Sequence, residues 1–191
     1  MSKASLLSSI AITDLETTGT DPRLHEIIEI GLILIDQRSL DILDSLDLKV
    51  RPEHIKTASE SALKLNGYNV IDWQDSISLK EAMGLYSYKT SDALFCSHNV
   101  TFDWSFINEA FRITGVENKM DYHRLDLLTM SWTLLRESNI EGFSLDKIAR
   151  FLGIGEEPIP HRAINGAQKA YEVLKKLISS EYKSNYHRRV I

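Results

Sequence analysis

The run from Ile27 to Asp36 is the feature that most constrains how this chain can fold. Its apolar residues are Ile27, Ile28, Ile30, Leu32, Ile33, Leu34 and Ile35. Such a nearly continuous run, rich in β-branched residues, is typical of a strand that is covered on both faces. Shorter apolar runs predict further strands over residues 10–14, 45–50 and 93–97.

Helical patterns follow the strands. Aromatic and small residues recur at three-and-four spacing in Phe102, Phe106, Ala110 and Phe111. Ser144 is placed to cap a helix that runs through Leu152, with Gly153 as its stop. A last long helix has one apolar stripe, made of Ala167, Ala170, Tyr171, Leu174, Leu177 and Ile178. Three strands followed by alternating helices and strands predict an α/β fold, with a mixed sheet covered by helices.

Composition excludes several classes of protein. With 191 residues, 43% of them hydrophobic, and only 4 Pro and 9 Gly, the chain can bury a sizeable core and is not disordered. Cys96 is its one cysteine, which excludes a disulfide framework or a cysteine-based zinc cluster and favours a reducing compartment. No segment is long and apolar enough to span a bilayer, and residues 3–12 lack the cleavage pattern of a signal peptide. We expect one cytoplasmic domain over residues 1–191, without a membrane partner.

Charge is unevenly distributed along the chain. The formal net charge of -5 is not that of a typical nucleic-acid or membrane-surface binder. Residues 169–191, however, hold six basic and two acidic side chains, a local charge of +4. This basic tail, whose last part is residues 179–191, is either a solvated helix end or a surface that contacts phosphate.

Two carboxylates stand at the end of the first predicted strand. Asp14 and Glu16 are two residues apart, so both project from the same face while Leu15 packs into the core. Adjacent carboxylates repel one another, and a divalent cation is the usual compensation. A strand end that runs into a solvated acidic turn is the structural alternative.

Two further polar clusters follow. The segment from His98 to Asp103 comes directly after the fourth strand, where Asn99 or Thr101 can cap the next helix. His161 lies in a proline-flanked loop before the last helix, and its imidazole is a candidate general base at neutral pH. Either cluster alone could be a structural cap. Two of the three clusters lie at carboxyl ends of strands, where open α/β sheets bind ligands.

The three clusters together resemble the DEDDh family of 3'→5' exonucleases. The motifs are Asp14-Leu15-Glu16-Thr17-Thr18-Gly19, His98-Asn99-Val100-Thr101-Phe102-Asp103 and His161-Arg162-Ala163. Weaker similarities are His25-Glu26-Ile27-Ile28-Glu29-Ile30-Gly31, Leu65-Asn66-Gly67, Asp126-Leu127-Leu128 and Ser144-Leu145-Asp146-Lys147-Ile148-Ala149. The resemblance covers about residues 8–178, in one order, and implies a ribonuclease H-like fold with a mixed five-stranded sheet flanked by helices.

The resemblance also implies a site. Two Mg²⁺ or Mn²⁺ ions would be held by Asp14, Glu16 and Asp103, while His161 would take the proton from the attacking water. The residues that would seat the terminal nucleotide are Thr17, Thr18, Gly19, Leu65, Asn66, His98, Asn99 and Phe102. The expected partner is nucleic acid, most simply a single-stranded 3' end. Binding to a polymerase-type partner and formation of a homodimer are both left open by the sequence.

One position departs from the family pattern. The third motif normally has an aspartate five residues after the histidine, and here that position is Gly166. Asn165 is a poor substitute, because one helical step rotates a side chain by about 100°. Two hypotheses therefore stand. The chain is a working metal-dependent 3'→5' exonuclease, or it is a catalytically impaired nuclease-like module that binds nucleic-acid ends or a polymerase-type partner.

Overall fold

The computed structural model describes residues 9–155 and 158–179. Its strands are β1 (Ser9–Thr17), β2 (Ile27–Asp36), β3 (Ile42–Lys49), β4 (Leu94–Ser97) and β5 (Arg124–Asp126). Its helices are α1 (Glu60–Asn66), α2 (Leu79–Lys89), α3 (Val100–Thr114), α4 (Leu127–Leu135), α5 (Leu145–Phe151) and α6 (Ala163–Ile178), with a short 3₁₀ turn, η1, at Ile55–Thr57.

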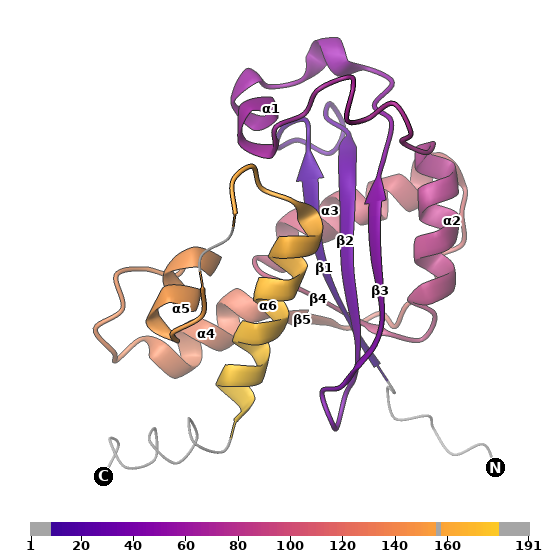
Figure 1. Ribbon diagram of the computed structural model, residues 1–191. Helices are drawn as coiled ribbons and strands as arrows, with labels where there is room; N and C mark the ends of the chain where they lie inside the picture. Colours follow the sequence, from indigo (N-terminus) through magenta and orange to yellow (C-terminus); the bar gives the residue numbers. More distant parts are fainter. Residues whose placement is uncertain (1–8, 156–157, 180–191) are drawn as a thin grey trace, which may run out of the picture.

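The strands form one mixed sheet in the order β3-β2-β1-β4-β5 (Figure 1). β2 pairs antiparallel with both β1 and β3, whereas β4 is parallel to β1 and to β5. The expected α/β sheet with four strands at these places is confirmed. β1 is longer than expected, because Asp14 and Glu16 lie within the strand, and β3 begins at Ile42 rather than at residue 45. The five-stranded sheet that the resemblance implies is also confirmed, but the place of β5 was not predicted, since three residues are too few for a periodicity signal.

β2 is covered on both faces, as its apolar run predicted. Ile30 and Leu32 belong to one buried cluster, and Ile33 and Ile35 belong to the other. This alternation is the period of two of a strand. Figure 1 shows α6, α4 and α5 on one side of the sheet and α3 and α2 on the other. Each fully buried Leu or Ile contributes roughly 1.5–3 kcal/mol, so the two clusters hold the sheet between its helical layers.

α6 packs against the sheet where a glycine makes room for it. A Cβ atom on Gly31 would lie 2.1 Å from the carbonyl oxygen of Ala163 and 2.4 Å from the amide nitrogen of Ile164. Gly31 pairs with Asp14 across the β1–β2 ladder. The first turn of α6 therefore lies directly over the strand position that carries the first acid of the predicted site.

The helix caps are partly as expected. Ser144 accepts a hydrogen bond from the Lys147 amide at the start of α5, and Gly153, beyond its end, has φ +71°. The expectation of a side-chain cap from Asn99 or Thr101 on α3 is wrong. Asn99 holds the N-cap position with φ 63° but makes no capping bond, and Asp126 accepts from the Val100 amide instead, at 3.0 Å.

The remaining expectations concern the ends of the chain. The apolar stripe of α6 is confirmed, because its members from Ala167 to Leu177 are buried. Apart from Ser179, the basic tail of residues 179–191 lies outside the described residues. Among the helices of the described ranges, none is long and apolar enough to cross a membrane.

Candidate active site

The three predicted motifs meet at one cavity of about 830 Å³. The predicted site residues that line it are Asp14, Glu16, Thr17, Gly19, Leu65, Asn66, His98, Phe102 and His161, with Gly166 beside them. Three predicted residues do not line it. Thr18 and Asp103 are buried behind its wall, and Asn99 is exposed elsewhere on the surface. The cavity therefore gathers side chains from β1, α1, α3 and α6 and from the loops that lead into them.

Asp14 and Glu16 are both half-buried, on one face of β1, while Leu15 between them is buried. The space that a side chain at residue 166 would fill is taken by Asp14. A Cβ atom on Gly166 would lie 2.2 Å from Oδ2 of Asp14 and 2.6 Å from its Cγ. Any larger residue at position 166 requires the Asp14 carboxylate to rotate away.

Asp103 is only 3% exposed. Burial raises the pKa of its carboxyl to about 7, while the nearby Leu15 backbone favours the charged form. Because Leu15 lies between Asp14 and Glu16, Asp103 lies behind the strand segment that carries the other two acids. A cation in the cavity would stabilise the ionised form of Asp103.

The donor chemistry of these acids suits a hard divalent cation. Mg²⁺ and Mn²⁺ prefer carboxylate oxygens and are commonly held by one or two carboxylates together with substrate phosphates. As the side chains stand, no group of three or more His, Cys, Asp or Glu in residues 9–155 and 158–179 is close enough to form a complete ligand set. Asp14 and Glu16 could therefore hold such a cation only together with further ligands, such as substrate phosphates.

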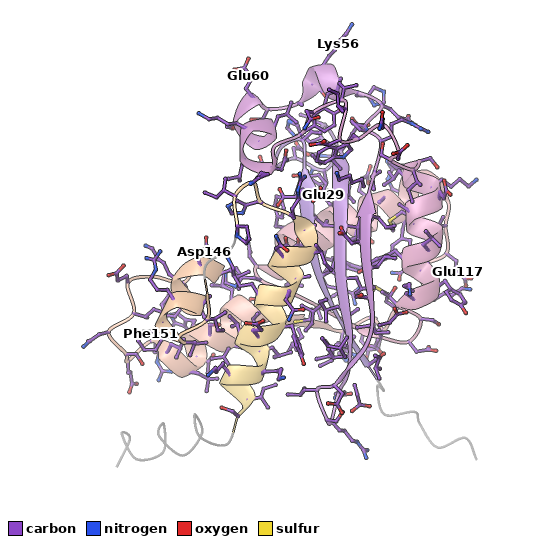
Figure 2. All side chains as sticks on the ribbon, in the orientation of Figure 1. Glu29, Lys56, Glu60, Glu117, Asp146 and Phe151 are labelled. Carbon is purple, nitrogen blue, oxygen red and sulfur yellow. The ribbon has the colours of Figure 1, made fainter. Side chains whose placement is uncertain are left out.

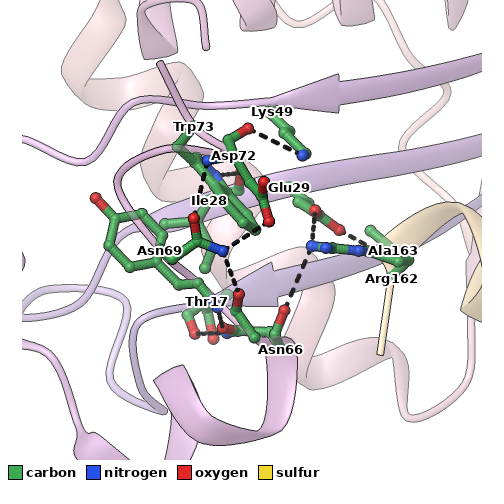
Figure 3. A network of polar contacts seen from close by, with 12 residues as sticks. Thr17, Ile28, Glu29, Lys49, Asn66, Asn69, Asp72, Trp73, Arg162 and Ala163 are labelled. Carbon is green, nitrogen blue, oxygen red and sulfur yellow. Dashed lines mark hydrogen bonds and ion pairs between the residues drawn. The ribbon is translucent and has the colours of Figure 1, made fainter. Parts of the chain in front are cut away.

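His161 enters the cavity from a loop that is tied to the sheet. Its amide donates to the carbonyl oxygen of Leu65 at 3.3 Å. The next residue, Arg162, donates from Nη1 to Oε1 of Glu29 at 2.8 Å, and the Ala163 amide donates to Oε2 of the same carboxylate at 3.1 Å (Figure 3). Burial raises the pKa of Glu29, which is 1% exposed, while the Ala163 amide and Arg162 stabilise its charge. One buried carboxylate thus fixes both the loop and the N-terminus of α6.

Asn66 links α1 to the same network. Its Nδ2 donates to the carbonyl oxygen of Thr17 at 3.1 Å, and its Oδ1 accepts from the Tyr68 amide at 3.2 Å. The hydroxyl of Thr17 donates to the carbonyl of Gly19, and the hydroxyl of Thr18 accepts from the amide of Glu26. The Asn66 amide group and the two threonine hydroxyls therefore stabilise the turn after β1.

Three residues of the weaker motif similarities, to which the sequence assigned no role, contribute to the site. Glu29 is the one charged residue inside the apolar run of β2, and that placement is the signal for it. Asp126 caps α3 through the Val100 amide and α4 through the Thr129 amide, each at 3.0 Å. It therefore fixes the start of α3, directly after His98. Asp146 lines the cavity and pairs with Lys169, which is buried one turn after Gly166.

His98 lies deeper in the cavity wall. Burial lowers the pKa of its imidazole, which nearby Asp126 and Asp146 oppose. Its Nδ1 is buried and has no hydrogen-bond partner among the described residues. The His98 ring lines the same cavity wall as Phe102.

The sheet and its helical layers have the ribonuclease H-like fold of the DEDDh exonucleases. The nuclease domain of 3'hExo, a DEDDh family member bound to rAMP, superposes with a TM-score of 0.70 at 19% identity, over 92% of this chain and 94% of that one. The zinc-bound E. coli ExoI–ssDNA complex superposes with a TM-score of 0.78 at 18% identity, over 95% of this chain and 42% of that one.

The chain belongs to the exonuclease family of RNase T type, whose model matches residues 11–174. A PolC-type DNA polymerase III of Caldanaerobacter subterraneus is 30% identical over 179 residues, which are 93% of this chain and 12% of that protein. The 3'-5' exonuclease DinG of Staphylococcus aureus is 30% identical over 111 residues, 58% of this chain and 12% of that protein. The chain thus spans about an eighth of the length of these relatives. The expected family and fold class are confirmed.

Proposed function

We propose that this chain is a metal-dependent 3'→5' exonuclease that releases nucleoside monophosphates from nucleic-acid 3' ends, and that the motif-bearing residues 8–178 act as one domain. The observation that carries the proposal is the single cavity onto which Asp14, Glu16 and His161 open, with the buried Asp103 carboxyl near the backbone of Leu15 between the two acids. Membership of the exonuclease family supports the reaction class. A relative that is a 3'-5' exonuclease supports hydrolysis in the 3'→5' direction.

Asp14, Glu16 and Asp103 are the residues that would hold Mg²⁺ or Mn²⁺. Such ions, when bound, would lower the pKa of an attacking water and neutralise charge on the attacking and leaving oxygens of the phosphodiester. The chain supplies Asp14 and Glu16 on one face of β1, with Asp103 buried behind the cavity wall, and repulsion between the two neighbouring carboxylates favours a divalent cation. Asp14 lines the cavity beside Gly166 and is therefore placed to take part.

His161 is proposed as the general base. An imidazole suits this role because its ordinary pKa lies near neutral pH. Its loop is anchored on both sides, by the bond from its own amide to Leu65 and by the Arg162–Glu29 ion pair. That anchoring would hold the ring at the mouth of the cavity, where the attacking water must lie.

The terminal nucleotide would occupy the rest of the cavity. Phe102 and Leu65 supply apolar walls there, and the polar wall is the turn from Thr17 to Gly19. Solved neighbours bound to rAMP and to a dA16 oligonucleotide support a nucleic-acid substrate for this fold. Asn66 and the two threonines would act mainly by keeping the wall in shape.

A second candidate function rests on Gly166. Without a carboxylate at this position, the chain could bind a 3' end without cutting it, beside a polymerase-type partner. The PolC-type relatives support that context, since the matched region is a small part of a replicative polymerase in each. Such a module would keep the cavity and its affinity for a strand end while losing turnover.

Hydrolysis of labelled single-stranded DNA and RNA with Mg²⁺ or Mn²⁺ separates the two functions. The unaltered chain is compared with Asp14→Ala and Gly166→Asp. Nucleotide release by the unaltered chain, abolished by Asp14→Ala, supports the exonuclease and excludes the impaired module. If only Gly166→Asp releases nucleotides, the impaired module is correct. If none does, the proposed mechanism is wrong.

A further inference from the structure

A second cavity, of about 620 Å³, lies beside the first and shares a wall with it. His25 lines both cavities. On α3, Phe102 lines the first cavity and Phe106 lines the second, and their ring centroids are 5.2 Å apart. Residues four apart on a helix lie about one turn apart on the same face, so the two cavities are neighbours along α3.

The imidazole ring of His25 forms the wall between the two cavities. A Cβ atom on Gly19 would lie 2.3 Å from the His25 ring, so the imidazole lies directly against the glycine. Nδ1 of His25 accepts a hydrogen bond from the Asp21 amide at 3.2 Å, which fixes the orientation of the ring. An extended strand that leaves the first cavity would pass this ring to enter the second.

Four cationic side chains from separate segments line the second cavity, namely Arg23, Arg51, Lys80 and Arg112. Arg112 is held by Glu109 through two hydrogen bonds, at 2.8 and 2.6 Å. Arg23, which is 81% exposed, contacts Asp21 at 3.4 Å. Arg51 and Lys80 are exposed, and neither has an ion-pair partner within the described ranges.

The acids of the second cavity are Glu26, Glu53 and Glu109. Glu26 is occupied, because its two oxygens accept the backbone amides of Glu53 and His54, each at 2.8 Å. Glu109 is neutralised by Arg112, as described above. Glu53 is exposed and is the acid that opposes Arg51 and Lys80 at this surface.

We propose that the second cavity binds the phosphodiester backbone of the strand whose 3' end lies in the first cavity, with Arg51 and Lys80 as its phosphate contacts. This inference rests on the proposed function, which places the 3' end beside Phe102. Cationic grooves that follow a backbone, next to aromatic rings that seat bases, are how proteins hold single strands without reading sequence. The site therefore extends the substrate from a nucleotide to an oligonucleotide.

The test measures binding apart from hydrolysis. Fluorescence anisotropy with 5'-labelled ten-nucleotide and two-nucleotide oligothymidines, in EDTA, compares the unaltered chain with the double variant Arg51→Gln/Lys80→Gln. We expect the double variant to bind the longer strand about tenfold more weakly, with the salt dependence of log K flattened by roughly 1.4 for two lost phosphate contacts. Binding of the two-nucleotide strand should stay within about twofold, because it ends at the first cavity.

Two further variants control for general charge effects. Lys56→Gln/Lys119→Gln removes two exposed cations that do not line either cavity (Lys56 points outward in Figure 2) and should leave both affinities unchanged. Glu53→Gln removes the opposing acid and should tighten binding of the longer strand about threefold. Tighter binding cannot result from a loss of folding.

The inference is wrong if the unaltered chain does not bind the ten-nucleotide strand, or if Arg51→Gln/Lys80→Gln binds it with unchanged affinity. It is also wrong if the double variant loses affinity equally for both strands, or if the control Lys56→Gln/Lys119→Gln loses as much affinity as the double variant. Nucleotide release with Mg²⁺ or Mn²⁺ is measured separately. If the unaltered chain releases nucleotides and the double variant binds normally, the cavity inference fails while the exonuclease proposal stands. If no variant releases nucleotides, the exonuclease proposal fails and anisotropy alone decides on the cavity.

Discussion

Two successive turns of α6 approach the sheet at positions where a glycine provides space. The group that occupies this space differs between the two positions. At Gly31 the space is filled by the backbone of Ala163 and Ile164. At Gly166 it is filled by the carboxylate of Asp14. Backbone packed against backbone cannot yield without moving a helix, whereas a carboxylate can rotate about its side-chain bonds. The first turn of α6 is therefore an anchor, and the second is a place where the site can change.

The largest expected effect comes from removing the Glu29 carboxylate, which holds the first turn of α6 on the sheet. Glu29→Ala leaves Arg162 without its buried partner and removes the cap on the Ala163 amide, so it should lower the free energy of unfolding by about 3–5 kcal/mol. Urea denaturation monitored by circular dichroism measures this loss. The control Glu60→Ala removes an exposed acid in the first turn of α1 and should cost less than about 1 kcal/mol. Similar losses in both variants would show that Glu29 is not an anchor.

A second test addresses the close approach itself. Gly31→Ala places a Cβ 2.1 Å from the Ala163 carbonyl, so α6 must move, and we expect a loss of about 3 kcal/mol in the free energy of unfolding. Gly84→Ala, inside α2, is the matched control, because a Cβ there meets nothing within 4 Å. That variant should gain about 0.5–1 kcal/mol. If Gly31→Ala is tolerated like Gly84→Ala, α6 does not lie as closely on the sheet as described.

The sequence predicted the sheet better than it predicted this anchor. Apolar periodicity identifies Ile27–Asp36 because burial on two faces leaves a pattern within one segment. The ion pair between Glu29 and Arg162 joins residues far apart in the chain, and no local pattern reports such a partner. The same holds for Asp126, which caps a helix that begins 26 residues earlier. The motif residues were found by resemblance, yet the burial of Asp103 and the place taken by Asp14 required the fold.

Asp126 offers a smaller anchor on the opposite side of the site. It accepts the Val100 and Thr129 amides, and Asp126→Ala should cost about 2 kcal/mol at pH 7 for the two lost caps. Partial burial raises the pKa of Asp126, but its hydrogen bonds outweigh burial and hold the pKa below the ordinary value of 3.8. The folded state thus binds this proton less readily than the unfolded state.

The sign of the pH effect follows from that shift. Stability contributed by Asp126 is present above pH 3.8 and is lost as pH falls through the depressed pKa. The difference in free energy of unfolding between the unaltered chain and Asp126→Ala should therefore shrink in acid. Urea titrations at pH 7 and at pH 3 measure it. A constant difference would mean that neutral hydrogen bonds, not the carboxylate charge, hold the two helices.

The smallest expected effect is at Gly166, and it bears most directly on the comparison. Gly166→Ala should change the free energy of unfolding by less than about 1 kcal/mol, because the helical gain over glycine offsets rotation of the Asp14 carboxylate. Gly166→Asp adds a charge beside Asp14, so it should be less stable than Gly166→Ala in EDTA and should gain more thermal stability from Mg²⁺ or Mn²⁺. Thermal denaturation in EDTA and in each metal measures both. A loss in Gly166→Ala as large as that in Gly31→Ala would show that Asp14 is held as rigidly as the backbone. The second turn of α6 would then be an anchor as well, and residue 166 could not regain a carboxylate without rebuilding the sheet contact.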